Sequence, residues 1–291
     1  MSTTAKTQSR TVPAQPEPDV RGERRAVPGL AAASRARAGV ELRSYFRNAQ
    51  YVVFTLMLPI MLLVIFASIF DGNVEGSNVP FRQYFIAGII AAGVMSTAFT
   101  GLAISVAMDR ENGIIRRLAI SPMPKGAYFI GKVVLVIITS ALEAAILLAI
   151  GTAVYGLELP TELSRWLTFA WVLALGTAAC ALLALAFTYL IPSANAAAAV
   201  VTPPFLILQF ISGVFFPFTN LPGWMQSVAS VFPLKWMTQG FRSVFLPDSF
   251  AANEASGAWD LQMVAIVLTA WIVVGGLAAL LTFRWRGARV K

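Results

Sequence analysis

The sequence predicts an all-α membrane protein with six transmembrane helices. Of its 291 residues, 57% are hydrophobic and only 12% are charged, and the mean hydropathy is +0.72. Soluble domains are typically about 45–50% apolar and about 25% charged. No long polar block is present that could form a soluble domain. Lipid is therefore the expected solvent for most of this chain.

Six stretches contain the roughly 20 mostly apolar residues that a helix needs to cross a bilayer. They cover residues 51–70, 84–108, 133–155, 166–191, 196–216 and 261–283. Pro59, Pro203 and Pro204 fall inside two of these stretches and predict kinks, which neighbouring helices can accommodate.

The segments outside the spans differ in composition. Residues 1–38 are rich in Ala, Arg, Pro, Ser and Thr without apolar periodicity, which predicts a disordered cytoplasmic tail rather than a signal peptide. Apolar and basic residues at helical spacing over 40–47 predict an amphipathic connector helix at the membrane surface. Residues 39–286 form the expected transmembrane domain, and 287–291 a short cytoplasmic tail.

The connection between the fifth and sixth spans is too long for a simple turn. Residues 218–237 are apolar but contain two prolines, a glycine and a lysine. This pattern predicts a re-entrant or interfacial helical hairpin rather than a span. Residues around 247–259 are polar and are expected to be exposed.

Charge predicts the orientation. Counted by segment, 18 of the 22 Lys and Arg residues fall on the side of the two termini and the 109–132 loop, against 4 on the other side. Cytoplasmic loops carry the excess of Lys and Arg, so both termini are expected in the cytoplasm of a multi-pass cell-membrane protein. The net charge of +8 is then explained by topology and contact with anionic lipids, and no nucleic-acid partner is expected.

Several kinds of chemistry are disfavoured. The chain has no His and one Cys, Cys180, so neither the commonest general base nor a Cys/His metal cluster is available. We expect no metal site, no catalytic residues and no enzymatic activity in this chain. The run from Gly126 to Lys132 fits G-x-x-x-x-G-K, but Val133 replaces the required Ser or Thr and a span follows. Lys132 is instead expected to snorkel to the interface.

The 109–132 loop is the most distinctive functional segment. A charged end to the second span is followed by a glycine break, a short amphipathic helix and a Pro-marked stop. Arg116 and Arg117 give this helix a basic side, and Ile114, Ile115, Leu118 and Ile120 an apolar side. Such a helix is suited to docking into a groove of a partner. The alternative is an ordinary basic loop that obeys the positive-inside rule.

The run DRENGIIRRLAISPMPKGAYFIGK resembles the coupling-helix signature of permease subunits of type-2 ABC exporters. Pro59 in the first span and the segments SGVFFP, LPGWM and FPL between 212 and 234 agree with that family, as does Arg242. The resemblance covers about residues 40–285 and is closest to the drug-resistance branch typified by daunorubicin exporters.

The resemblance implies an exporter of hydrophobic or amphipathic compounds, either drugs and antibiotics or lipids. This chain would bind no cofactor, and a separate ABC ATPase subunit would hold ATP and magnesium. A second copy or homologue of the permease and membrane lipids are the other expected partners. The residues expected to couple to the ATPase are Asp109, Arg110, Glu111, Gly113, Ile114, Arg116, Arg117, Leu118 and Pro122. The family often has Thr-Leu-Glu where this chain has Ile114-Ile115-Arg116, so one charge is reversed.

Polar groups inside the second and fifth spans include Thr97, Thr100, Gln209 and Ser212, and such groups more often hold helices together than bind ligands. In the family that the chain resembles, these two spans line the central path, and this resemblance makes Thr97, Thr100, Gln209 and Phe210 candidate lining residues. Ser212 and Glu143 complete the expected substrate path. A carboxylate at the depth of Glu143 is costly and by default suggests function. It could contact a cationic substrate, pair with a basic residue, carry a proton, or be protonated and bonded to a hydroxyl such as Thr139 or Ser140. The alternative function is an ion-coupled secondary transporter that uses Glu143.

Overall fold

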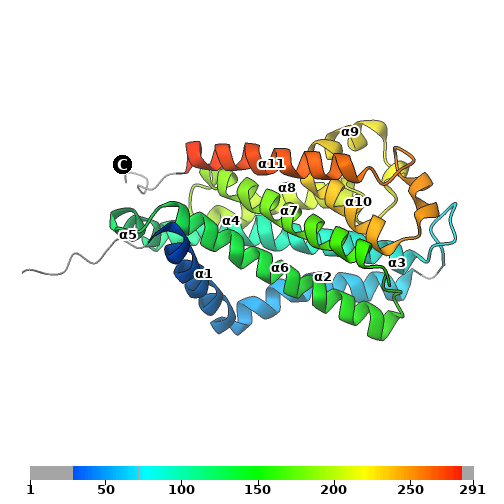
Figure 1. Ribbon diagram of the computed structural model, residues 1–291, viewed down its shortest axis with the longest axis horizontal. Helices are drawn as coiled ribbons and strands as arrows, with labels where there is room; N and C mark the ends of the chain where they lie inside the picture. The colour runs from blue at the N-terminus through cyan, green and yellow to red at the C-terminus, as the bar shows by residue number, and fades with distance from the viewer. Residues whose placement is uncertain (1–28, 71, 284–291) are drawn as a thin grey trace, which may run out of the picture.

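The computed structural model describes residues 29–70 and 72–283, and helices dominate this part of the chain (Figure 1). The α-helices are α1 (Leu30–Arg47), α2 (Ala49–Ile69), α3 (Phe81–Met95), α4 (Leu102–Glu111), α5 (Ile114–Ile120), α6 (Gly126–Tyr155), α7 (Leu163–Phe187), α8 (Ala194–Ile211), α9 (Gly223–Val231), α10 (Pro233–Phe245) and α11 (Leu261–Thr282). A π-helical turn, Ser96–Gly101, joins α3 to α4. No strand occurs among the described residues, which confirms the all-α prediction.

Five helical stretches are long and apolar enough to cross a membrane. They are Phe81–Glu111, Gly126–Tyr155, Leu163–Leu190, Ala194–Ile211 and Leu261–Thr282. In α2 the stretch counted as apolar, Thr55–Ile69, is shorter than the roughly 20 residues of a typical span. Five of the six predicted spans therefore correspond to such helices, and the first span, over 51–70, stays a prediction.

The long helices lie side by side along the long axis of the molecule (Figure 1). α11 packs along α7, and α10 lies against α3, α7 and α11. α5 and the beginning of α1 lie at one end of the bundle, whereas α9 and α10 lie toward the other (Figure 1). The segments singled out in the sequence are therefore divided between the two ends.

Two predicted boundaries differ from the structure. α1 begins at Leu30, so residues 30–38 are helical instead of belonging to a disordered tail, and their many alanines favour this because Ala has the highest helix propensity. α8 ends at Ile211 because Gly213, with φ 74°, turns the chain in a left-handed conformation. The predicted tails over 1–28 and 287–291 lie outside the described residues.

The segment between α8 and α11 contains the predicted pair of helices, α9 and α10, which meet at an extended corner at Phe232. All residues of α10 are buried, so this helix belongs to the interior of the fold. Phe250 and Glu254 are also buried, so the expectation of an exposed segment over 247–259 was wrong for these residues. Whether the hairpin penetrates the bilayer stays a prediction.

The G-x-x-x-x-G-K near-match lies on the first two turns of α6. A phosphate-binding loop requires a strand–loop–helix arrangement whose free backbone N–H groups surround the phosphates. A continuous helix does not supply such a loop, so this segment does not have the backbone of a phosphate-binding loop.

Candidate functional site

The loop expected to face a partner folds as a short helix, α5, at one end of the bundle. Gly113, with φ 73°, makes the left-handed turn that lets α5 leave the line of α4. Ile115 is buried and anchors α5 to the bundle, whereas Ile120 is 85% exposed. Arg116 and Arg117 are also exposed. The predicted apolar side of α5 is therefore not a single surface. Ile115 faces the bundle, whereas Ile120 is exposed together with the two arginines.

The inner side of α5 is held against the bundle, and its end is closed by a hydrogen bond. Ile114 and Leu118 are half-buried, and Leu118 packs against the main core. Ser121 donates a hydrogen bond from Oγ to the Leu118 carbonyl at 2.9 Å. Pro122 is exposed just after the helix. The helix is thus firmly attached at its base and accessible on its outer surface.

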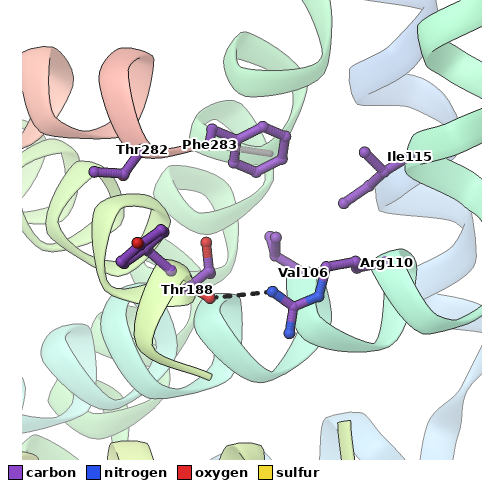
Figure 2. A pocket seen from close by; sticks show the side chains of 7 residues that line it. Val106, Arg110, Ile115, Thr188, Thr282 and Phe283 are labelled. Atoms are coloured by element: carbon purple, nitrogen blue, oxygen red, sulfur yellow. Dashed lines mark hydrogen bonds between the residues drawn. The ribbon is translucent and has the colours of Figure 1, made fainter. Parts of the chain in front are cut away.

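The end of α4 is bonded to the turn between α7 and α8. Arg110 donates from Nη1 to the Thr188 carbonyl at 3.3 Å, as Figure 2 shows, and from Nη2 to the Ile191 carbonyl at 2.5 Å. The Glu111 carboxylate accepts the backbone N–H of Ala194, the first residue of α8, at 2.7 Å. A carboxylate is favourable there because the helix N-terminus carries a partial positive charge. Arg110 and Glu111, which we call the α4–α8 clamp, therefore join the α5 corner to α8.

A small cavity lies beside the clamp, lined by side chains from α4, α5, the α7–α8 turn and the end of α11 (Figure 2). Its volume of about 20 Å³ leaves room for about one water molecule. This space is too small for a substrate.

A buried charge cluster lies next to the clamp. Lys132 is 1% exposed, and its Nζ lies 3.0 Å from Glu41 Oε2 and 2.8 Å from Asp109 Oδ2. It also donates to Ser105 Oγ at 3.0 Å, while the Tyr128 hydroxyl donates to Asp109 at 3.1 Å. The snorkelling prediction for Lys132 was wrong, because two carboxylates meet its charge inside the protein. Glu41, Asp109 and Lys132, called here the charge cluster, connect α1, α4 and α6.

Two of the predicted substrate-path residues lie together. Glu143 is 2% exposed, and its Oε2 accepts a hydrogen bond from Thr97 on the π-helical turn at 2.7 Å. Its Oε1 has no partner among the described residues. A Cβ at Gly93 would lie 2.5 Å from this atom, so glycine makes room for the carboxylate. The hydroxyl that donates to Glu143 therefore belongs to Thr97, across the interface between α6 and the π-helical turn. The sequence had suggested Thr139 or Ser140 for this role.

The other substrate-path candidates do not gather into one pocket. The buried hydroxyls of Thr100 and Ser212 have no hydrogen-bond partner among the described residues. Gln209 is buried, whereas Phe210 is exposed and packs on Phe215 with ring centroids 5.0 Å apart. Within one copy of the chain, Phe210 is therefore the candidate most accessible to a ligand.

A second buried ion pair stabilises the opposite end of the bundle. Arg242 is 1% exposed, with Nε 2.5 Å from Glu254 Oε1 and Nη2 3.0 Å from Oε2. It also donates to the Gly213 carbonyl and to the Tyr84 hydroxyl, at 3.1 and 3.2 Å. Burial lowers the pKa of nearby Lys235 to about 8, although the Glu254 carboxylate opposes this shift. The sequence identified Arg242 but gave no indication of its partner.

Comparison with known proteins agrees with this arrangement. The sequence profile described as "ABC-2 type transporter" matches residues 38–246, which is most of the chain. This chain belongs to the ABC-2 type transporter family. The match begins within α1 and ends just after α10, so it includes α5, the α4–α8 clamp and the charge cluster.

Curated proteins that this ABC-2 family member resembles are described as permeases. It is 26% identical over 192 residues to the "Probable multidrug ABC transporter permease YbhR" of Escherichia coli K12, covering 66% of this chain and 51% of that protein. It is 25% identical over 227 residues to the "Inner membrane transport permease YadH" of the same organism, covering 76% and 87%. It is 26% identical over 196 residues to the "Putative transport permease ycf38" of Porphyra purpurea, covering 65% and 66%. The chain spans about half the length of YbhR.

Proposed function

We propose that this chain is the membrane-spanning permease subunit of an ATP-driven exporter, with ATP and magnesium held by a separate ABC ATPase subunit. The α4–α8 clamp is the observation that carries this proposal. α5 follows α4 after the turn at Gly113. At the end of α4, Arg110 bonds the α7–α8 turn and Glu111 bonds the N-terminus of α8, so a force applied to α5 would reach α8 through the end of α4. ATP binding would move α5, and the spans would change their packing as connected rigid elements.

The outer surface of α5 is the proposed contact with the ATPase. Arg116, Arg117 and Ile120 are exposed there, which combines two cations with a large apolar side chain. A groove with acidic groups at its rim would complement this surface. Charge complementarity of this kind guides association and selects the partner.

The chain is a multi-pass membrane protein, and we place both termini in the cytoplasm of a cell-membrane protein. The 18-to-4 distribution of Lys and Arg supports this orientation. It places α5 and the clamp on the side where a soluble ATPase would bind.

A second copy or a homologous permease is the proposed membrane partner. α8 and α9 expose a set of large apolar side chains that includes Leu206, Ile207, Phe210, Trp224, Val228 and Val231. A path between two copies would use this surface and suit hydrophobic or amphipathic compounds, such as drugs, antibiotics or lipids. The "multidrug" description of YbhR supports that class of substrate.

An ion-coupled transporter is the second candidate, because one oxygen of the buried Glu143 carboxylate has no partner among the described residues. A proton-carrying role requires the carboxyl group, so Glu143→Gln would abolish any pH dependence of transport. In the proposed exporter, the same variant would retain ATP-dependent transport.

The proposal is tested by ATP hydrolysis in reconstituted vesicles. The chain is combined with an ABC ATPase subunit from the same organism, and a panel of lipophilic compounds is tested for stimulation. Arg116→Glu with Arg117→Glu should reduce ATPase binding and stimulation about tenfold or more, because two charges in the interface are reversed. Arg47→Glu is the matched control, since α1 ends away from α5 (Figure 1). Failure of the unmodified chain to bind the ATPase would overturn the proposal.

A further inference from the structure

A pocket at the end of the bundle opposite α5 has the chemistry of an amphiphile site. It lies among α2, α3, α6 and the turn after α6, with a volume of about 170 Å³. Its buried walls are apolar and come from Leu63, Ala67, Ile86 and Leu157. Gly151, which also lines the pocket, lies so close to Ile86 that a Cβ there would be 2.5 Å from Cδ1.

Two opposite charges line the same pocket. Arg82, at the start of α3, and Glu158, just after α6, are both exposed. No ion pair joins them, and in the described part of the chain neither side chain has a hydrogen bond or ion pair with another residue. By contrast, Arg165 nearby is paired with Asp248 at 3.2 Å. The pocket therefore offers one available cation and one available anion above an apolar wall.

A wider pocket of about 630 Å³ adjoins it and shares Pro80, Gln83 and Glu158 as lining residues. Both polar and apolar residues line this wider space, and its charged residues are Glu158, Glu162 and Arg165. The narrower pocket reaches the buried apolar residues of the bundle. A charged opening above an apolar interior is the order found at a membrane interface, where spanning helices end. An amphiphile could therefore place its headgroup at the wide opening and hydrocarbon in the narrow part.

We propose that this pocket binds a phospholipid with a zwitterionic headgroup. Its phosphate lies against Arg82, its ammonium group lies against Glu158, and part of one acyl chain occupies the apolar pocket. A purely anionic headgroup would face repulsion from Glu158, and a cationic one repulsion from Arg82. A cavity of about 150 Å³ is known to hold benzene, so the pocket takes a short segment of a single chain. The remaining hydrocarbon lies along the lipid-facing surface of the spans.

The proposal does not depend on transport or on an ATPase, so photolabelling tests it on the chain alone. The full chain is placed in lipid nanodiscs with a trace of phosphatidylethanolamine that carries a diazirine near the start of one acyl chain. A second probe has the same diazirine on phosphatidylglycerol, which is anionic. Labelled peptides are identified by mass spectrometry after illumination.

Labelling by the ethanolamine probe should concentrate on residues 63–86 and 151–158. Glu158→Gln should reduce it about two- to fivefold, as expected for the loss of an exposed ion pair, without reducing labelling by the glycerol probe. Arg82→Gln should reduce labelling by both probes. Glu75→Gln removes another exposed carboxylate that does not line the pocket, and it should change nothing.

Two results would overturn the proposal. One is equal labelling of the pocket by the two probes in the unmodified chain. The other is a Glu158→Gln variant that labels like Glu75→Gln. The variants change exposed side chains, and size-exclusion profiles matching the unmodified chain will show that the fold is intact.

Discussion

Removing the charge of Lys132 should strongly destabilise the protein. Lys132→Met preserves the length of the side chain but removes the cation that Glu41 and Asp109 share. Glu41 keeps its ion pair with Arg37, so Asp109 is the carboxylate left without a cation among the described residues. Removing one partner from a buried ion pair costs about 3–5 kcal/mol, because the remaining charge is uncompensated. For a chain of this size, each kcal/mol of lost stability lowers the midpoint of thermal unfolding by about 2–4 °C. The midpoint of Lys132→Met should therefore fall by roughly 6–20 °C.

Thermal unfolding in detergent, followed by size-exclusion chromatography of the soluble fraction, measures this change. Arg43→Met is the control, since Arg43 is an exposed cation on α1. Substitutions there should stay within about 0.5 kcal/mol.

A compensating variant makes the test specific for the charge cluster. Lys132→Met combined with Asp109→Asn removes the stranded charge, so it should recover part of the lost stability. An unfolding midpoint for Lys132→Met equal to that of Arg43→Met would refute the reasoning. Additive losses in the double variant would also refute it, because they would show that the groups do not interact.

Three further substitutions probe other parts of the fold. Gly88→Ala should cost about 1–3 kcal/mol in thermal unfolding, because its Cβ would lie 2.4 Å from the Val214 carbonyl oxygen; an unchanged midpoint would contradict this packing. Arg242→Met should cost about 3–5 kcal/mol by leaving its buried carboxylate partner unpaired, and a loss below 1 kcal/mol would contradict a paired charge. Ile207→Glu places a charge on the exposed α8 surface that is proposed to contact a second copy, so it should halve the molecular mass measured by light scattering. Leu281→Glu, at an exposed position on α11, should leave the mass unchanged. Equal masses for the two variants would place the second copy elsewhere.

The spans were predictable because their apolar content requires a helix in lipid, where every backbone polar group must be satisfied internally. α1 was harder to delimit because its first turns are rich in Ala and Arg and lack an apolar period. Such a sequence resembles a solvated tail. The contact of α1 with α6, including the ion pair between Glu41 and Lys132, is not visible in local composition.

The interior position of α10 was also beyond the sequence. Lys235, Gln239 and Arg242 suggest an interfacial helix, yet all three are buried. Their partners come from further along the chain: Glu254 binds Arg242, and the Trp259 carbonyl accepts from Gln239 at 2.8 Å. Only the tertiary fold brings these groups together.

The site was predictable in position but not in its connections. The glycine break and the short helix of α5 agree with the pattern around Gly113 and Pro122. The sequence assigned Glu111 to an ATPase contact, whereas the structure bonds it to the N-terminus of α8; a contact with an ATPase stays a prediction. An intramembrane charge requires a partner, and this rule could have suggested pairing Lys132 with Asp109 across the loop.

A distance measurement tests the central claim, that α5 and α8 move as one unit when an ATPase acts. Spin labels on Ile120→Cys and Asn195→Cys use two exposed positions, and native Cys180 is buried. Pulsed electron resonance on the complex with the ATPase subunit compares the nucleotide-free and vanadate-trapped states. The distance within one copy should stay constant, while the distance between the Asn195 positions of two copies changes. Arg110→Gln with Glu111→Gln should broaden the first distance. A shift within one copy of the unmodified chain, with no change between copies, would contradict the account.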